Sequence, residues 1–457
     1  MSERPHHRNE SASRAVPSAV LAPLLLALTV VSASGCDTKT AAVSSASTDA
    51  VPAASSVTQP LRRRPITTSA GIALGNLDGD IAERIRANDA TPSARLRLVD
   101  LLLARGEYLG RIADLEQADD LAKGTAARFP QDADARLARA LTHAALHRFD
   151  AASAELDEAA RRGAPLTRVA ATRSSIALAR GDYDEADALL RRAVGRPAGA
   201  ADAAVESSGD VLAIATAAVI AGRMQKLERA EHLFDVARDA YRDVSPFPLA
   251  WMDFQRASVL AAHGREDAAR RYFEEACEVL PPYAHAAVHL AASEAPERAI
   301  ERLSAVLETS DDPDVFGGLA AAHERAGLPT EAAHFAARAR ARFVDLVARH
   351  RAAFADHAAR FYLGQGNDPN EALSLARENA ELRPSEEALD LWMAAGAAAS
   401  RRDDVCAAGA KIDGLRYASA RAQKLAHALL SSCSDRHFTV GGGASWIGRR
   451  PVPPTNP

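Results

Sequence analysis

Residues 181–186 read Gly181-Asp182-Tyr183-Asp184-Glu185-Ala186, and this stretch decides the fold class. Glycine followed by aspartate favours a turn, and the next residues favour a helix that ends before Pro197. Three- and four-residue steps place apolar or small side chains on one face of that helix, at Tyr183, Ala186, Leu190 and Ala193. The pattern also occurs about 34 residues upstream, so the sequence predicts a repeated helix-turn-helix. That earlier copy runs from His147 to Ala152, with Ala159 and Pro165 after it.

Further copies extend the pattern over most of the chain. A small residue follows each turn at intervals of about 34 residues, some of them longer. These positions are Ala118, Ala152, Ala186, Ala230, Ala269, Ala299, Ala332, Ala372 and Cys406. One helix pair cannot bury its apolar stripe alone, so each pair needs a neighbour on both sides. The spacing therefore predicts a stacked array of about eight helix pairs.

This pattern resembles the tetratricopeptide repeat (TPR) family. Three stretches match the family best. They are residues 181–186 followed by Ala193, Gly264 followed by Ala269, Phe273, Ala276 and Pro281, and residues 368–372 followed by Pro384. The first helices depart from the family pattern, because they rarely carry its Trp and almost never its Leu-Gly. The resemblance implies an all-α, right-handed superhelical solenoid of antiparallel helix pairs, which binds protein partners on its concave face.

Composition agrees with a helical protein and excludes some functions. Apolar residues make up 47% of the chain, mostly as alanine, and aromatic residues only 5%. Alanine, leucine, arginine and glutamate are strong helix formers. The formal net charge is −5, with both signs interspersed, so we expect no nucleic-acid partner.

The N-terminus is predicted to direct export. Arg4, Arg8 and Arg14 precede an apolar run over 15–31, which is typical of a secretory signal. The run ends at Ala33-Ser34-Gly35-Cys36, which resembles the lipobox of bacterial lipoproteins. That resemblance implies that Cys36 is lipidated and anchors the mature chain to the periplasmic face of the inner or outer membrane. An ordinary signal peptide that happens to lie near a cysteine is the alternative.

Five segments follow from these patterns. Residues 1–35 are predicted to be the signal peptide, and 36–69 a flexible Ser/Thr/Ala/Pro linker that starts at the lipidated cysteine. Residues 70–410 form the repeat array and 411–433 a helix that caps it. Residues 434–457 are rich in Gly and Pro and are predicted to be a disordered tail.

Candidate partner-binding residues come from the repeat register, which places certain first-helix side chains on the concave face. Aromatic and arginine side chains are typical anchors of a peptide-binding groove. The candidates are Trp251, Phe254, Arg325, His357 and Phe361. A shift of one or two residues in the register would place the aromatic residues in the core instead, so core and groove remain alternatives.

The cysteines and histidines are the residues that could support disulfide or metal chemistry. Cys406 and Cys433 could form a disulfide that joins the cap to the last repeat; otherwise Cys406 fills a small packing site. Cys277 is predicted to be a buried thiol. Two histidine pairs, His143 with His147 and His285 with His289, have a four-residue spacing that allows metal chelation. Neither pair has an evident third ligand, so we expect no metal and no cofactor.

The sequence therefore predicts a non-catalytic adaptor or scaffold in the bacterial cell envelope, with a protein or complex as partner and no evident small-molecule substrate. An alternative is a helical envelope enzyme that acts on peptidoglycan or carbohydrate, with acids that the sequence does not single out. A third hypothesis is a purely structural spacer without a stable partner.

Overall fold

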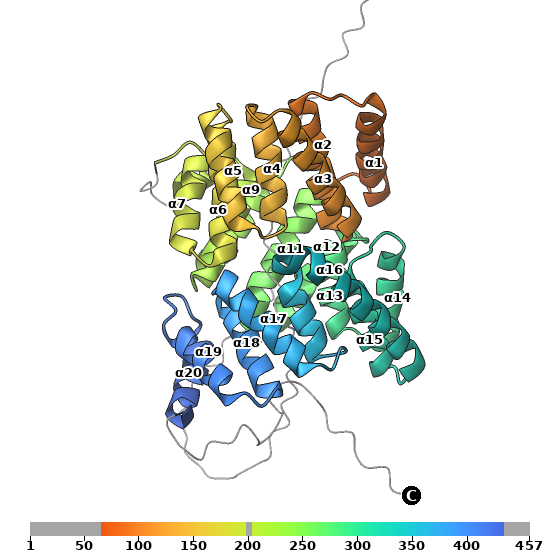
Figure 1. Cartoon of the computed structure of the whole chain (residues 1–457), viewed down its shortest axis with the longest axis vertical. Coiled ribbons are helices and arrows are strands. Elements are labelled where there is room, and N and C mark those ends of the chain that lie inside the picture. The colour runs from red at the N-terminus through yellow and green to blue at the C-terminus, as the bar shows by residue number, and fades with distance from the viewer. Residues whose placement is uncertain (1–64, 198–202, 434–457) are drawn as a thin grey trace, which may run out of the picture.

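The computed structural model describes residues 65–197 and 203–433, and all regular secondary structure within them is helical. Helix α1 spans Ala70–Ala87 and α20 spans Ala420–Cys433, and the helices between them are connected by short turns (Figure 1). The intervening helices are α2 Pro92–Leu109, α3 Ile112–Arg128, α4 Ala133–Ala145, α5 Phe149–Arg161, α6 Leu166–Arg180, α7 Tyr183–Ala193, α8 Ala203–Glu206, α9 Val211–Arg223, α10 Leu227–Ala240, α11 Pro246–Ala262, α12 Glu266–Val279, α13 Ala284–Ser293, α14 Pro296–Leu307, α15 Pro313–Arg325, α16 Pro329–Leu363, α17 Pro369–Leu382, α18 Glu386–Ala398 and α19 Arg402–Asp413.

Successive helices pack in pairs, as the repeat spacing predicts. Helix α2 packs on α3, α4 on α5 and α6 on α7, and the pairing continues to α18 on α19. Helix α16 belongs to two pairs, because His350 has non-helical backbone angles (φ −136°, ψ 46°) and divides it. Helices α1 and α20 flank the array. No described helix is long and apolar enough to cross a bilayer.

The small residues of the repeat lie where paired helices approach each other. Ala152, Ala186, Ala230 and Ala299 are fully buried on the second helices of their pairs. At Ala186 the approach is close enough for the Ser174 hydroxyl on α6 to donate a hydrogen bond of 2.7 Å to the Ala186 carbonyl. A larger side chain at Ala186 would separate α6 from α7.

Two clusters of buried apolar side chains make up the core. One runs from α1 to α15, and the other is built mainly from α15 to α20. We call α1–α7 the N-terminal arm and α14–α20 the C-terminal arm. Figure 1 shows the N-terminal arm in the upper part of the view and α16–α20 in the lower part, with α11 and α12 between them.

Candidate functional site: the seam between the two arms

Three turns of the N-terminal arm contact three segments of the C-terminal arm, and we call this contact the seam. The turns join the two helices of successive pairs, so they recur on one side of the array. They meet the C-terminal arm in the same order along the chain. The facing positions are Gly110 with Ser310, His147 with Ala352, and Gly181 with Pro384.

The first contact involves the turn between α2 and α3. The carbonyl of Gly110 accepts hydrogen bonds from the Ser310 hydroxyl at 2.9 Å and from the Asp311 amide at 3.2 Å. The Ile112 amide, which begins α3, donates to the Asp311 carboxylate at 2.6 Å. Gly110 has a φ of +59°, and a Cβ atom there would lie 2.7 Å from the hydroxyl oxygen of Ser310. This approach of the two arms therefore requires glycine.

The second contact is polar and contains two histidines. His147 lies in the turn between α4 and α5 with a φ of +53°, and its Nδ1 lies 3.2 Å from the carbonyl of Ala352. His350, at the break in α16, has its Nε2 3.0 Å from the Glu116 carboxylate. Arg349 forms an ion pair with the same carboxylate. The broken turn of α16 is thus the part of the C-terminal arm that faces α3 and the α4–α5 turn.

The third contact joins the opening motif to the end of the array. The Asp184 carboxylate accepts a hydrogen bond from the Tyr417 hydroxyl at 2.7 Å and pairs with Arg416 at 2.5 Å. Arg223, at the end of α9, forms an ion pair with Glu387 at the start of α18. Burial lowers the pKa of the Arg223 guanidinium from its ordinary value.

A cavity of about 520 Å³ lies at this third contact. Its walls come from the α6–α7, α9–α10 and α11–α12 turns on one side and from the α17–α18 and α19–α20 loops on the other. Carboxylates outnumber guanidinium groups in the lining. The charged residues are Asp182, Asp184, Glu185, Glu386 and Glu387, with Arg223 and Arg416 as the cations.

A second polar group of residues lies inside the superhelix. The Nδ1 atom of His357 is 2.5 Å from the Asp314 carboxylate, and Asp356 pairs with Arg383 at 2.8 Å. Burial would lower the pKa of His357, but Asp356 and Asp314 raise it to about 9. Burial, together with Asp314, raises the pKa of Asp312 to about 7. Asp312 caps α15, since its side chain accepts from the Asp314 amide at 2.8 Å.

The histidine pairs pack among other side chains. His289 stacks on Phe273 with ring centroids 5.0 Å apart, and burial lowers its pKa to about 4. Burial also lowers the pKa of His143 to about 4 and that of His147 to about 3. Within the described ranges, no group of three or more potential ligands has the geometry to hold a metal ion.

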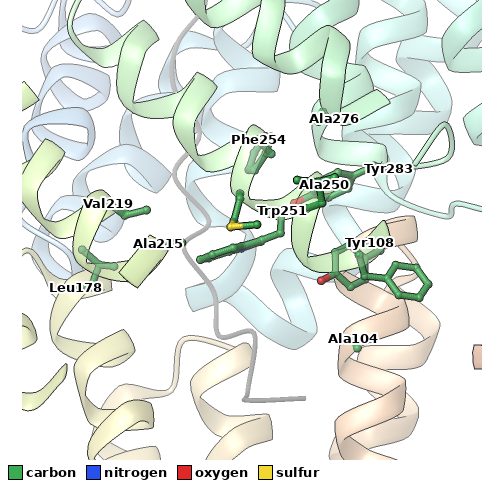
Figure 2. Close-up of a cluster of buried hydrophobic side chains, with 14 of the residues drawn as sticks. Ala104, Tyr108, Leu178, Ala215, Val219, Ala250, Trp251, Phe254, Ala276 and Tyr283 are labelled. Carbon is green, nitrogen blue, oxygen red and sulfur yellow. The ribbon is translucent and has the colours of Figure 1, made fainter. Parts of the chain in front are cut away.

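Four of the five candidate partner-binding residues are buried, which corrects their assignment to an open groove. Trp251 is 6% exposed and lies with Phe254 in the apolar cluster that Figure 2 shows around Tyr108 and Tyr283. His357 and Phe361 are also buried. First helices such as α11 have neighbours on several sides: α11 packs on α9, α10 and α12, and its Phe247 stacks on Tyr108 of α2.

Arg325 is the exception among the candidates. It is exposed at the end of α15, and one guanidinium nitrogen donates to the Ala291 carbonyl at 2.9 Å. Arg325 thus stays a candidate for contact with a partner.

Cys406 and Cys433 form a disulfide, with Cα atoms 6.0 Å apart, that connects α19 to the last residue of α20. Cys277 is a buried free thiol, and burial raises its pKa to about 12. Cys36, the predicted lipidation site, lies outside the described residues, as do the signal peptide, most of the linker and the tail.

The sequence did not predict the seam. Its contacts join residues that are far apart in the chain, such as Ile112 with Asp311 and Asp184 with Tyr417. No local pattern marks such residues as partners. The only signal was indirect: the turns recur, so they had to share one side of the array.

Among known proteins, similarity to this chain is found in solved structures. No protein-family model matches the sequence, and no curated protein matches it. Among solved structures, the TPR domain of P58(IPK) is similar with 16% identity over 76% of this chain and 99% of that chain, at a TM-score of 0.21. Yeast Tom70 is similar with 12% identity over 79% and 96%, at 0.36. The Cut9–Hcn1 hetero-tetramer of APC/C is similar with 11% identity over 77% and 92%, at 0.29.

The helix pairs, their stacking order and the buried small residues between them define the class of this chain. Over the described residues it is an all-α, TPR-like solenoid.

Proposed function

We propose that the protein is an exported, lipid-anchored scaffold that holds a protein partner in the bacterial cell envelope. The observation that carries this proposal is the solenoid itself. Stacked helix pairs create an extended surface on which repeated turns present side chains to a partner. The seam adds a recessed, charged part to that surface, at the cavity beside Asp184 and Tyr417.

Two further observations support the cellular location. The segment before Cys36 has the basic start, apolar run and small residues of a lipoprotein signal. The disulfide between Cys406 and Cys433 is a kind of bond that persists in oxidising compartments such as the periplasm. The linker over 36–69 is long enough to hold the array about 30 Å from the membrane surface.

A catalytic role is less well supported by the geometry. The acids that converge inside the superhelix, Asp312, Asp314 and Asp356, are engaged with a helix N-terminus, with His357 and with Arg383.

Crosslinking and affinity purification from membranes test the proposal. The unaltered protein should fractionate with membranes and capture a specific partner in a constant ratio. Cys36→Ala should release the protein from the membrane fraction while leaving its fold intact. Capture of no specific partner would contradict the scaffold, and unchanged membrane association of Cys36→Ala would contradict the lipid anchor.

A further inference from the structure

The cavity at the third contact of the seam has an excess of negative charge. Five carboxylates and two guanidinium groups line it, so these groups sum to −3. The side chains of Asp182 and Glu185 are exposed and have no ion-pair partner among the described residues. Charge complementarity therefore favours a cationic occupant.

The cavity already accommodates one guanidinium group of the chain itself. The Arg416 guanidinium lies 5.1 Å from the centre of the Tyr417 ring and pairs with Asp184 at 2.5 Å. The Tyr183 ring lies 6.0 Å from that of Tyr417, on the opposite arm. The side chain of Arg416 is 73% exposed, so a competing cation can displace it at low cost.

A second observation points to a ligand that also carries a hydrogen-bond acceptor. Arg223 lines the cavity and is 7% exposed, yet its Nη2 atom has no hydrogen-bond partner. A buried donor without a partner is costly, so a shift of the Arg223 side chain toward an acceptor brought by a ligand would be stabilising. His263 also lines the cavity; its Nδ1 lies 2.9 Å from the Val259 carbonyl, and its buried Nε2 lacks a partner. Peptide backbone supplies acceptors and donors together.

We propose that this cavity binds a basic peptide segment of the partner protein. An arginine or lysine side chain of that segment replaces Arg416 over the Tyr417 ring, and faces Asp182, Asp184 and Glu185. A backbone carbonyl of the same segment accepts a hydrogen bond from Arg223. This inference rests on the proposed scaffold function and gives it a place and a partner chemistry.

The test is fluorescence anisotropy with the full-length protein in detergent and a fluorescein-labelled peptide of alternating glycine and arginine. Asp182→Asn with Glu185→Gln should weaken binding about ten-fold, because it removes two unpaired carboxylates. Neither residue caps α7 through its side chain, so the fold should persist. Arg416→Ala should strengthen binding a few-fold, since it frees Asp184.

A matched control is Glu297→Gln with Glu301→Gln, which removes the same charge from exposed positions on α14 and should leave binding unchanged. Equal affinity of the Asp182/Glu185 variant and the unaltered protein would overturn the proposal. So would equal affinity for a glutamate version of the peptide. A ten-fold gain in affinity on deleting residues 434–457 would assign the cavity to the chain's own tail instead.

The membrane capture experiment distinguishes a wrong binding site from a wrong scaffold function. If the Asp182/Glu185 variant still captures the partner on membranes in the same ratio, the scaffold stands and the cavity is not its binding site.

Discussion

At the scale of single residues, Trp251 shows what packing does to an aromatic side chain on a first helix. It lies on α11, where Phe254 contacts the rings of Phe273 and Tyr283 at centroid distances of 5.8 and 5.3 Å. Trp251 contributes to the free energy of unfolding through the apolar surface that it buries. Its position stabilises the fold rather than presenting an anchor to a partner.

Trp251→Ala is therefore expected to lower the free energy of unfolding by about 3–5 kcal/mol, the usual cost of truncating a buried aromatic residue. Urea denaturation followed by far-UV circular dichroism measures the change. Leu166→Ala, at a residue that is 72% exposed, serves as the control and should have little effect. If Trp251→Ala kept full stability and lost partner capture, the groove assignment would be right after all.

At the scale of elements, the end of the array depends on a covalent connection. Helix α20 has only one repeat helix, α19, as its extensive neighbour. The disulfide closes a loop of 27 residues between them, and Arg402 on α19 donates to the carbonyl of Cys433 at 2.7 Å. A terminal helix with one neighbour frays easily, so this bond holds the cap in place.

Replacing both cysteines, as Cys406→Ala with Cys433→Ala, should cost about 3–4 kcal/mol of local stability, the loop-closure value for this separation. Hydrogen exchange should become faster in α20 and stay unchanged in α6 and α7. A reducing agent should have the same effect on the unaltered protein and none on the variant. Unchanged exchange in α20 would show that packing alone holds the cap.

At the scale of the whole molecule, the seam connects the two arms and makes the fold sensitive to acid. Burial lowers the pKa of His147 to about 3 against 6.5 in the unfolded chain, and Arg383 adds to the shift. Below pH 6.5 the unfolded chain binds a proton at His147, whereas the folded protein does not. The contribution of His147 is therefore fully present above pH 6.5 and is lost as the pH falls toward 3.

His147→Asn should flatten the decline in stability between pH 6.5 and 4. At pH 4.5 protonation of His147 in the unfolded chain should lower the free energy of unfolding of the unaltered protein by about 2–3 kcal/mol relative to neutral pH. The variant lacks this group and should not show that loss. Asparagine tolerates the positive φ at this turn, so the backbone is kept. Urea denaturation at several pH values measures the slope, with His334→Asn at an exposed position as control. Parallel pH curves for His147→Asn and the unaltered protein would contradict the role of His147.

The repeated small residues were enough to predict the helix pairs. Ala152, Ala186 and Ala230 are each buried against the first helix of their own pair, a contact made within about 34 residues. Such a contact depends on the local sequence and on helix geometry. The concave candidates Trp251 and Phe361 were harder to assign, because their exposure depends on the register of the first helix and on which neighbouring helices cover it.

The sequence alone determined that this chain is an array of antiparallel helices, because small residues at a regular spacing make neighbouring helices pack. It could not determine that the array closes on itself. Closure depends on rotations between successive pairs that add up over the array and bring Gly110 to Ser310 and Asp184 to Tyr417. In residues 181–186, the sequence identified a turn and a helix start. Only the tertiary structure placed Asp182, Asp184 and Glu185 in the wall of a cavity between two arms.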